Sequence, residues 1–186
     1  IFCILHIAFP NMGYILLSKV NNEVTQRMAN ETKNNNFHTF MVLAYKESSY
    51  LEDCIISLLN QTQKSQIIIT TSTPNGHIER IANKYDIKIK VNHNCNGIAS
   101  DWNFALEQST TDLITLVHQD DIYLPEYCNS VINALMARKD SLITFTNYSE
   151  LVSDSVIRND LCLIIKRLLL CPFYLRRSWH SNIVKK

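Results

Sequence analysis

The chain has 186 residues, of which 46% are hydrophobic and 19% charged, and its formal net charge at pH 7 is +1. This length suggests one domain with a substantial core, and the composition is that of an ordinary soluble globular protein. No basic block stands out, so nucleic acid is not expected as the principal partner. The 6 cysteines are scattered without zinc-type spacing, which favours reduced thiols in a reducing compartment such as the cytoplasm.

Residues 1–36 are interpreted as an N-terminal segment outside the main domain. The apolar run 1–17 lacks a charged start and is interrupted by proline, asparagine and glycine, so it fits neither a signal peptide nor a membrane span. It is either a strand or short helix packed on the domain, or sequence upstream of a real start at Met12 or Met28. Residues 21–36 are polar and aperiodic, as in a linker or a frayed helix.

From residue 37 onward, short apolar runs alternate with helical patterns. The apolar or β-branched runs predict strands at residues 39–44, 66–70, 87–91, 113–117 and 142–146. Apolar residues at helical spacing predict helices at residues 50–61, 78–85, 98–107 and from 125 to about 138. Ser48 or Ser49 is the expected N-cap of the first helix. This alternation predicts an α/β domain over residues 37–151, with a mostly parallel sheet and right-handed crossovers.

Residues 152–186 are interpreted as a truncated, helical C-terminal extension, and the chain as a fragment of a longer protein. Residues 161–170 are apolar with Lys166 and Arg167 among them, which predicts an amphipathic helix. The segment 161–177 either packs on its own domain or makes peripheral contact with a membrane surface, as basic amphipathic segments do. Packing is favoured because the helical pattern is not cleanly two-faced.

A cluster of polar residues follows the fourth predicted strand: His118, Gln119, Asp120 and Asp121. Open α/β sheets bind their ligands outside the carboxyl ends of the strands, where this cluster would lie. Two aspartates beside a histidine offer oxygen ligands and a nitrogen ligand for Mg²⁺ or Mn²⁺ on a phosphorylated substrate. In the alternative interpretation, the aspartates only cap the next helix or solvate a turn.

Three stretches of the chain resemble family 2 glycosyltransferases of the GT-A fold. Residues 42–62, VLAYKESSYLEDCIISLLNQT, are similar to the family's opening strand, tyrosine-bearing loop and first helix. Residues 97–103, GIASDWN, are similar to its Gly-x-x-x-x-x-Asn helix start. Residues 118–125, HQDDIYLP, stand at the position of its Asp-x-Asp motif. The stretches follow one another in the family's order.

The resemblance implies a Rossmann-like domain that holds a nucleoside-diphosphate sugar, in the first place a UDP-sugar, at the carboxyl edge of the sheet. A divalent cation, Mn²⁺ or Mg²⁺, would bridge the acidic motif and the diphosphate. The implied donor-binding residues are Tyr45, Thr71, Ser72, Gly97, Asn103 and Asp120. The implied metal ligands are Asp120 and Asp121, with His118 at the first acidic position of the motif, where imidazole can ligate Mn²⁺.

Several of these residues admit other interpretations. The family's aspartate-bearing turn after the second strand is replaced by Thr71 and Ser72, whose hydroxyls can accept a bond from a uracil imide but lack a carboxylate's charge. Tyr45 either stacks on the base or covers the core. Asp101 either lies beside the diphosphate or has a structural role in the first turn of a helix, and the structural role is favoured. Trp102 is expected in the core.

The favoured function is transfer of a sugar from a nucleotide-diphosphate donor to a saccharide or lipid-linked acceptor, as in surface polysaccharide assembly. The implied location is the cytoplasm, including the inner face of the membrane. An inverting transferase needs a general base, but Glu150, Asp154 and Asp160 follow the acidic motif in no matching context, so no catalytic residue is assigned. The rival hypothesis is a glycosyltransferase-like module that binds a nucleotide or partner without catalysis.

Overall fold

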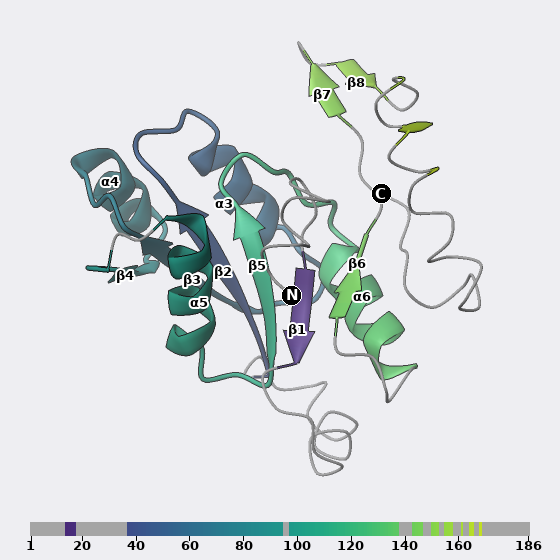
Figure 1. Ribbon diagram of the computed structural model, residues 1–186. Helices are drawn as coiled ribbons and strands as arrows, with labels where there is room; N and C mark the ends of the chain where they lie inside the picture. Colours follow the sequence, from purple (N-terminus) through teal and green to yellow (C-terminus); the bar gives the residue numbers. More distant parts are fainter. Residues whose placement is uncertain are drawn as a thin grey trace.

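A computed structural model describes residues 14–17, 37–94, 97–137, 143–146, 150–152 and 155–157, together with Leu161, Ile164, Ile165 and Leu168. Strands form one sheet in the order β4-β3-β2-β5-β1-β6 (Figure 1). The neighbouring strands β4 (Lys88–Val91), β3 (Gln66–Thr71), β2 (His38–Ala44) and β5 (Leu113–His118) are parallel. The predicted α/β fold with a mostly parallel sheet is therefore confirmed.

The outer part of the sheet contains a strand from the N-terminal segment. β1 (Tyr14–Leu17) pairs antiparallel with β5 on one side and with β6 (Ile143–Phe145) on the other. Of the residues 1–17, the structure describes only 14–17, and they form a strand that covers the backbone edge of β5. The alternatives for the start of the chain stay open. β7 (Glu150–Val152) and β8 (Ser155–Ile157) form a separate antiparallel pair. The predicted division of the chain at residues 36 and 151 stays a prediction.

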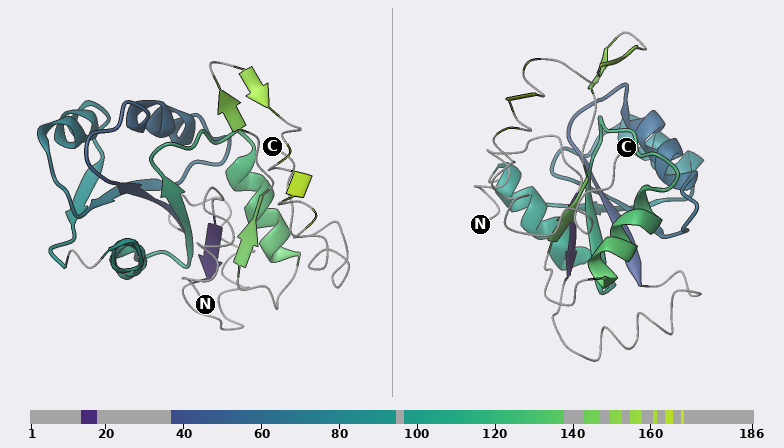
Figure 2. Two further views of the ribbon diagram at one scale, coloured as in Figure 1. Left: turned by 45° about the horizontal axis from the view of Figure 1, so that its top comes forward. Right: turned by 90° about the vertical axis from the view of Figure 1, so that its right-hand side faces the viewer.

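Helices cover both faces of the sheet, as parallel strands require for their crossovers. The helices are α3 (Leu51–Leu59), α4 (Gly76–Lys84), α5 (Ile98–Gln108) and α6 (Tyr127–Met136). Side chains of α3, α4 and α6 share one core cluster, and α5 packs into a second cluster on the opposite face (Figure 2, left). The helices and strands predicted between residues 37 and 146 are all present, with ends that agree to within about two residues. The extension predicted to be helical instead begins with strand residues, at the end of β7 and in β8, and the helix predicted at residues 161–170 lies mostly outside the described residues.

Strand β2 is buried on both faces, and its side chains alternate between the two clusters. Phe40 and Val42 pack with α3, α4 and α6, whereas Met41 packs with Trp102 and Leu116 on the α5 side. A strand covered on both faces gains stability from every apolar side chain, which is why β2 has a continuous apolar sequence and not an alternating one.

Helix starts differ in how their backbone N–H groups are satisfied. The Asn75 side chain accepts hydrogen bonds from the backbone of His77 and Ile78, both at 3.0 Å, and caps α4. The N-cap of α3 is Tyr50, which makes no side-chain cap bond, so the expectation of a serine cap was wrong. The Ser48 hydroxyl accepts a hydrogen bond from the backbone N–H of Tyr50, so Ser48 stabilises the turn before the helix and not the first turn of the helix itself.

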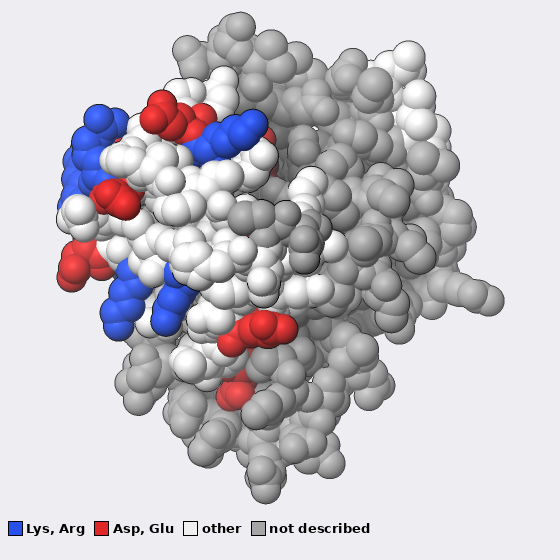
Figure 3. Space-filling view, turned by 60° about the vertical axis from the view of Figure 1, so that its left-hand side comes forward, with Lys and Arg blue, Asp and Glu red and all other residues white. Residues whose placement is uncertain are grey.

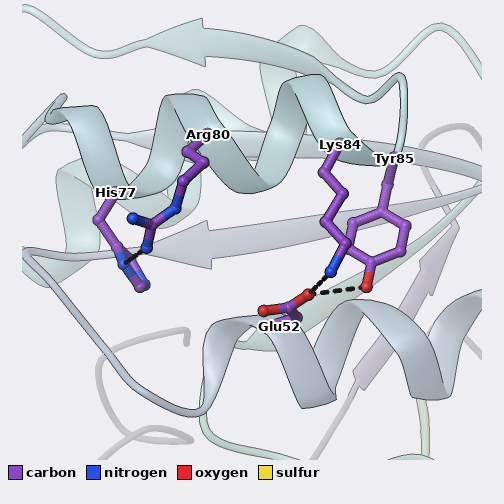
Figure 4. A network of polar contacts seen from close by, with 5 residues as sticks. All are labelled: Glu52, His77, Arg80, Lys84 and Tyr85. Atoms are coloured by element: carbon purple, nitrogen blue, oxygen red, sulfur yellow. Dashed lines mark hydrogen bonds and ion pairs between the residues drawn. The ribbon is translucent and has the colours of Figure 1, made fainter.

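A polar contact joins α3 to α4 at the surface (Figure 4). Glu52 Oε1 lies 2.5 Å from Lys84 Nζ and accepts a hydrogen bond from the Tyr85 hydroxyl at 2.8 Å. The bonds from Lys84 and Tyr85 hold the pKa of Glu52 below its usual value. Arg80 contacts His77 on the same helix at 3.1 Å. Both members of the ion pair are exposed, so solvent weakens this link between the helices.

Charged side chains of both signs lie beside one another on the face shown in Figure 3. In the part of the chain that the structure describes, no helix combines the length and the apolar character needed to cross a bilayer. Most of residues 161–177 lie outside the described set. The described residues of that segment are helical and exposed: Leu161, Ile164, Ile165 and Leu168. The predicted membrane contact stays a prediction.

Candidate functional site

A cavity of about 520 Å³ opens at the carboxyl edge of the sheet. Its walls come from the ends of β2, β3 and β5 and from the first turn of α5. This is the edge at which open α/β sheets bind ligands, and the volume lies within the usual range of small-molecule sites. The cavity brings together residues that are far apart in the sequence, from Leu43 to Asp120.

The loop after β2 is held in place by its neighbours on both sides. The Gln119 side-chain amide donates to the Tyr45 carbonyl at 2.9 Å and accepts from the Tyr45 N–H at 3.0 Å. Lys46 has a φ of 55°, in the left-handed region, and its N–H donates to Thr73 Oγ1. The amide of Gln119 thus continues the pairing of β2 with β5 by one residue. Tyr45 itself is 52% exposed and lines the cavity.

In the acidic motif at the end of β5, some side chains line the cavity and others lie outside it. Asp120 is exposed and lines the cavity, and His118 lines it while packing edge-on against Trp102, with ring centroids 5.5 Å apart. Asp121 is half-buried outside the cavity lining, and its N–H donates to the His118 carbonyl at 3.2 Å. This turn carries the chain from the strand end into the following loop.

The loop after the acidic motif is anchored from α3. The buried Gln61 side chain donates to the Leu124 carbonyl at 2.8 Å and accepts from the Cys128 N–H at 2.9 Å. Tyr123 and Tyr127 pack edge-on with ring centroids 4.7 Å apart. Burial raises the pKa of Tyr123 well above its usual value, so this phenol stays protonated and belongs to the core. The strand end with Asp120 is therefore attached to a fixed support.

On the opposite side of the cavity, a carboxylate from α5 meets the ends of β3 and β4. Asp101 accepts hydrogen bonds from Ser72 Oγ at 2.9 Å and from Asn92 Nδ2 at 2.8 Å. Gly97, the N-cap of α5, has a φ of 86°, a conformation that glycine adopts without strain. The glycine lets the chain enter the helix so that Asp101 lines the cavity.

Residues 39–182 match the sequence profile of Glycosyl transferase family 2, which is most of the chain. The chain belongs to this family. An uncharacterized glycosyltransferase of Rickettsia conorii is 30% identical over 118 residues, which cover 59% of this chain and 20% of the relative. A second uncharacterized glycosyltransferase, from Rickettsia felis, is 28% identical over 111 residues, which cover 56% of this chain and 18% of the relative. The chain thus spans about a fifth of the length of these relatives.

Among solved structures, the chain is similar to TarS of S. aureus. The match has a TM-score of 0.47 and 18% identity, and it covers 53% of this chain and 19% of that chain. The family assignment confirms the resemblance seen in the three sequence stretches, all of which lie within residues 39–182.

In this family 2 domain, the predicted donor-binding residues are only partly brought together. Tyr45, Ser72, Gly97 and Asp120 line the cavity. Thr71 does not. Successive side chains of a strand lie on opposite faces, and Thr70 is the one of this pair that lines the cavity, whereas the Thr71 hydroxyl accepts a bond from the Thr73 N–H at 3.0 Å. Asn103 is exposed on α5 and lies outside the cavity lining. The assigned roles themselves stay predictions.

Several polar residues that line the cavity were not assigned to the site from the sequence: Thr70, Thr73, Asp101 and Gln119. Thr73 and Gln119 each follow the last residue of a strand by one or two positions, and this placement at the carboxyl edge was the available signal. For Asp101, the only signal in the sequence was its position in the first turn of a predicted helix. Trp102 is in the core, as predicted, and also lines the cavity.

The predicted metal ligands do not form a pre-built cluster. Within the described residues, no group of three or more His, Cys, Asp and Glu side chains could hold an ion. The exposed Asp120 carboxylate nevertheless suits a cation of the Mg²⁺ type, which takes one or two protein carboxylates and completes its shell with phosphate oxygens and water. Of the acidic residues considered as a general base, Glu150 lies in β7, and Asp154 and Asp160 lie outside the described residues.

Proposed function

We propose that this family 2 domain binds a nucleoside-diphosphate sugar in the cavity and transfers the sugar to a saccharide or lipid-linked acceptor. The supporting observation is the cavity itself, at the carboxyl edge of a parallel sheet, with the Asp120 carboxylate at the end of β5 open to it. Surface polysaccharide assembly in the cytoplasm, at the inner face of the membrane, is the proposed setting.

The charges of the cavity support a divalent cation, Mn²⁺ or Mg²⁺, as part of the site. Among the described residues that line it, Asp101 and Asp120 carry carboxylates and none is a lysine or arginine. A diphosphate adds further negative charge, so its binding there requires a counter-charge. Asp120 would hold the cation, with His118 beside it in the cavity wall. When bound, the cation stabilises the charge that the leaving diphosphate gains.

Tyr45 and Gln119 have positioning roles in this proposal. The exposed ring of Tyr45 offers an apolar face on which a base or sugar can pack. Because both polar atoms of the Tyr45 backbone are bonded to Gln119, the ring is presented from a fixed loop. A fixed loop loses little conformational entropy when the ligand binds.

A second candidate function is a family 2 binding module that holds the donor without transferring it. Transfer to a hydroxyl needs a general base, and the described cavity wall offers only two carboxylates. One of them is bonded to Ser72 and Asn92, and the other is the proposed cation ligand. This observation favours the module unless residues outside the described set supply the base.

Calorimetric titration of the chain with UDP, with and without Mn²⁺, tests the donor site. We expect binding that depends on Mn²⁺ and weakens at least about tenfold in Asp120→Asn, because a charged ligand of the cation is lost. Asp53→Asn, at an exposed position in the first turn of α3, is the matched control and should bind as the unaltered chain does. Equal affinity in Asp120→Asn would contradict the proposal.

A second assay separates the enzyme from the binding module. Release of UDP from UDP-sugars is measured in the presence of saccharide and lipid-linked acceptors. Acceptor-dependent release supports transfer. If the chain binds UDP with Mn²⁺ but forms no UDP from UDP-sugars, the result supports the binding-module hypothesis.

A further inference from the structure

The carboxylate of Asp101 is held at the cavity by two neutral donors from different strand ends. Ser72 follows β3, and Asn92 follows β4 and is itself buried. Asn92 is fixed in turn, because its backbone N–H donates to the Thr71 carbonyl at 2.8 Å. The half-buried Asp101 side chain therefore has a defined orientation in the cavity wall.

Asp101 retains hydrogen-bonding capacity toward the cavity. A carboxylate accepts about four hydrogen bonds and donates none, and the bonds from Ser72 and Asn92 use one acceptor position on each oxygen. A carboxylate that only interacts favourably with the helix dipole does not require hydrogen bonds from two other strand ends, and it does not need to line a cavity. The side chain thus presents an acceptor to whatever fills this part of the cavity.

This acceptor lies at the opposite side of the cavity from Asp120. Ser72 follows β3 and Asp120 follows β5, and β2 lies between these strands in the sheet. Two strand spacings amount to about 10 Å. If the diphosphate and its cation lie at Asp120, an extended nucleotide would place its base on the Asp101 side.

We propose that Asp101 selects the base of the nucleotide, by accepting a hydrogen bond from a ring N–H. This inference rests on the proposed function of the cavity. Uracil and guanine carry such an N–H at the edge used for pairing. Cytosine and adenine carry a ring-nitrogen lone pair at the same place, and this lone pair faces the carboxylate unfavourably. The selecting carboxylate comes from the first turn of α5, and Ser72 orients it.

The test compares the dissociation constants of UDP, GDP, CDP and ADP in the presence of Mn²⁺, by calorimetry on the chain and on Asp101→Asn. Bonds to charged acceptors are among the stronger ones, so we expect UDP or GDP to bind about tenfold more tightly than CDP and ADP. In Asp101→Asn this ratio should fall close to one. Whether UDP or GDP binds more tightly distinguishes uracil from guanine as the preferred base.

Two further variants isolate the effect. Asp53→Asn removes an exposed acid from the first turn of α3 and should keep the full ratio, because it changes only the charge at a helix start. Ser72→Ala removes one of the donors that orient Asp101 and should lower the ratio by a smaller factor. It also serves as the test if circular dichroism shows that Asp101→Asn does not fold.

The outcomes separate this inference from the proposed function. An unchanged ratio in a folded Asp101→Asn or Ser72→Ala, or an equal loss of affinity for every nucleotide, would overturn the inference and leave Asp101 a structural residue. A preference of the unaltered chain for CDP or ADP would overturn it as well. If the folded chain binds none of the nucleotides, the proposed function fails, and the inference fails with it.

Discussion

The two ends of strands β2 and β5 carry polar side chains in opposite settings. At the amino end, His38 is fully buried, and its ring nitrogens lie 2.8 Å from Ser65 Oγ and 2.7 Å from Thr115 Oγ1. At the carboxyl end, Gln119 bridges the strands at the surface, and Asp120 opens into the cavity. The same pair of strands thus has a closed polar cluster at one end and an open one at the other.

The closed cluster consists of uncharged groups that satisfy one another. Burial lowers the pKa of His38 to about 3 and raises the pKa of Cys128, whose sulfur lies 3.4 Å from Ser65 Oγ, to about 12. Both groups are therefore neutral near pH 7. Buried polar groups with all partners present stabilise a fold, whereas a cavity residue with spare acceptor capacity can bind a ligand. The comparison therefore assigns the polar residues at the amino end of the strands a structural role and makes those at the carboxyl end candidates for ligand binding.

The largest expected effect comes from opening the closed cluster. His38→Ala should lower the free energy of unfolding by about 3 kcal/mol, because it leaves a void and removes partners of Ser65 and Thr115. Urea denaturation measures this change. His93→Ala, at an exposed ring, should stay within about 0.5 kcal/mol of the unaltered chain. A loss below about 1 kcal/mol in His38→Ala would show that the cluster is not closed.

The pH dependence of stability tests the same cluster. The pKa of His38 is about 3 in the folded chain, and the usual value of 6.5 applies after unfolding, so the unfolded chain binds more protons between these values. The contribution of His38 therefore decreases as pH falls below 6.5. Between pH 7 and pH 5 we expect a loss of about 2 kcal/mol in the free energy of unfolding. His38→Gln cannot titrate and should lack this component when urea denaturation is repeated at both pH values.

An intermediate effect is expected at the open end. Gln119→Ala removes both bonds to the Tyr45 backbone at a solvent-exposed site, which should cost about 1 kcal/mol of stability or less. Affinity for UDP with Mn²⁺ should fall by a larger relative amount, about threefold to tenfold, because the Tyr45 loop is no longer fixed. Gln63→Ala is the control, since Gln63 bonds only its neighbour Lys64 among the contacts seen. Unchanged UDP affinity in Gln119→Ala would argue against the positioning role.

The smallest effect is expected outside both ends, at the contact between α3 and α4 (Figure 4). Glu52→Gln removes an ion pair whose side chains are 38% and 59% exposed. The midpoint of urea unfolding should shift slightly downward at low salt, and the shift should vanish at high salt because mobile ions screen exposed charges. A shift that persists at high salt would indicate that the link is not mainly ionic.

The fold could be predicted from the sequence where the pattern is local. The continuous apolar run of β2 and the spaced apolar residues of α3 each mark their own element, because burial on one or both faces requires them. Strand β1 could not be assigned in this way. Its sequence, YILL, has no alternation, and its place between β5 and β6 depends on residues about a hundred positions later in the chain.

The site could be predicted in part for the same reason. Tyr45 follows the end of β2 by one residue and Asp120 follows the end of β5 by two, and the carboxyl edge of the sheet was enough to place them. Asn103 was assigned by resemblance, yet the helix turns it away from the cavity lining. The contact of Asp101 with Ser72 joins positions 29 residues apart and leaves no local pattern in the sequence.

By itself, the sequence determined the alternation of strands and helices between residues 37 and 146, the family, and some of the residues at the carboxyl edge, because hydrophobic period and strand ends are local properties. Only the tertiary structure decided which of those residues share a cavity. The sheet places β2 between β3 and β5, and α5 lies across the face where the cavity opens. Because side chains from these separate elements meet only after the strands pair, the Tyr45–Gln119 bridge and the Asp101 acceptor arise from packing.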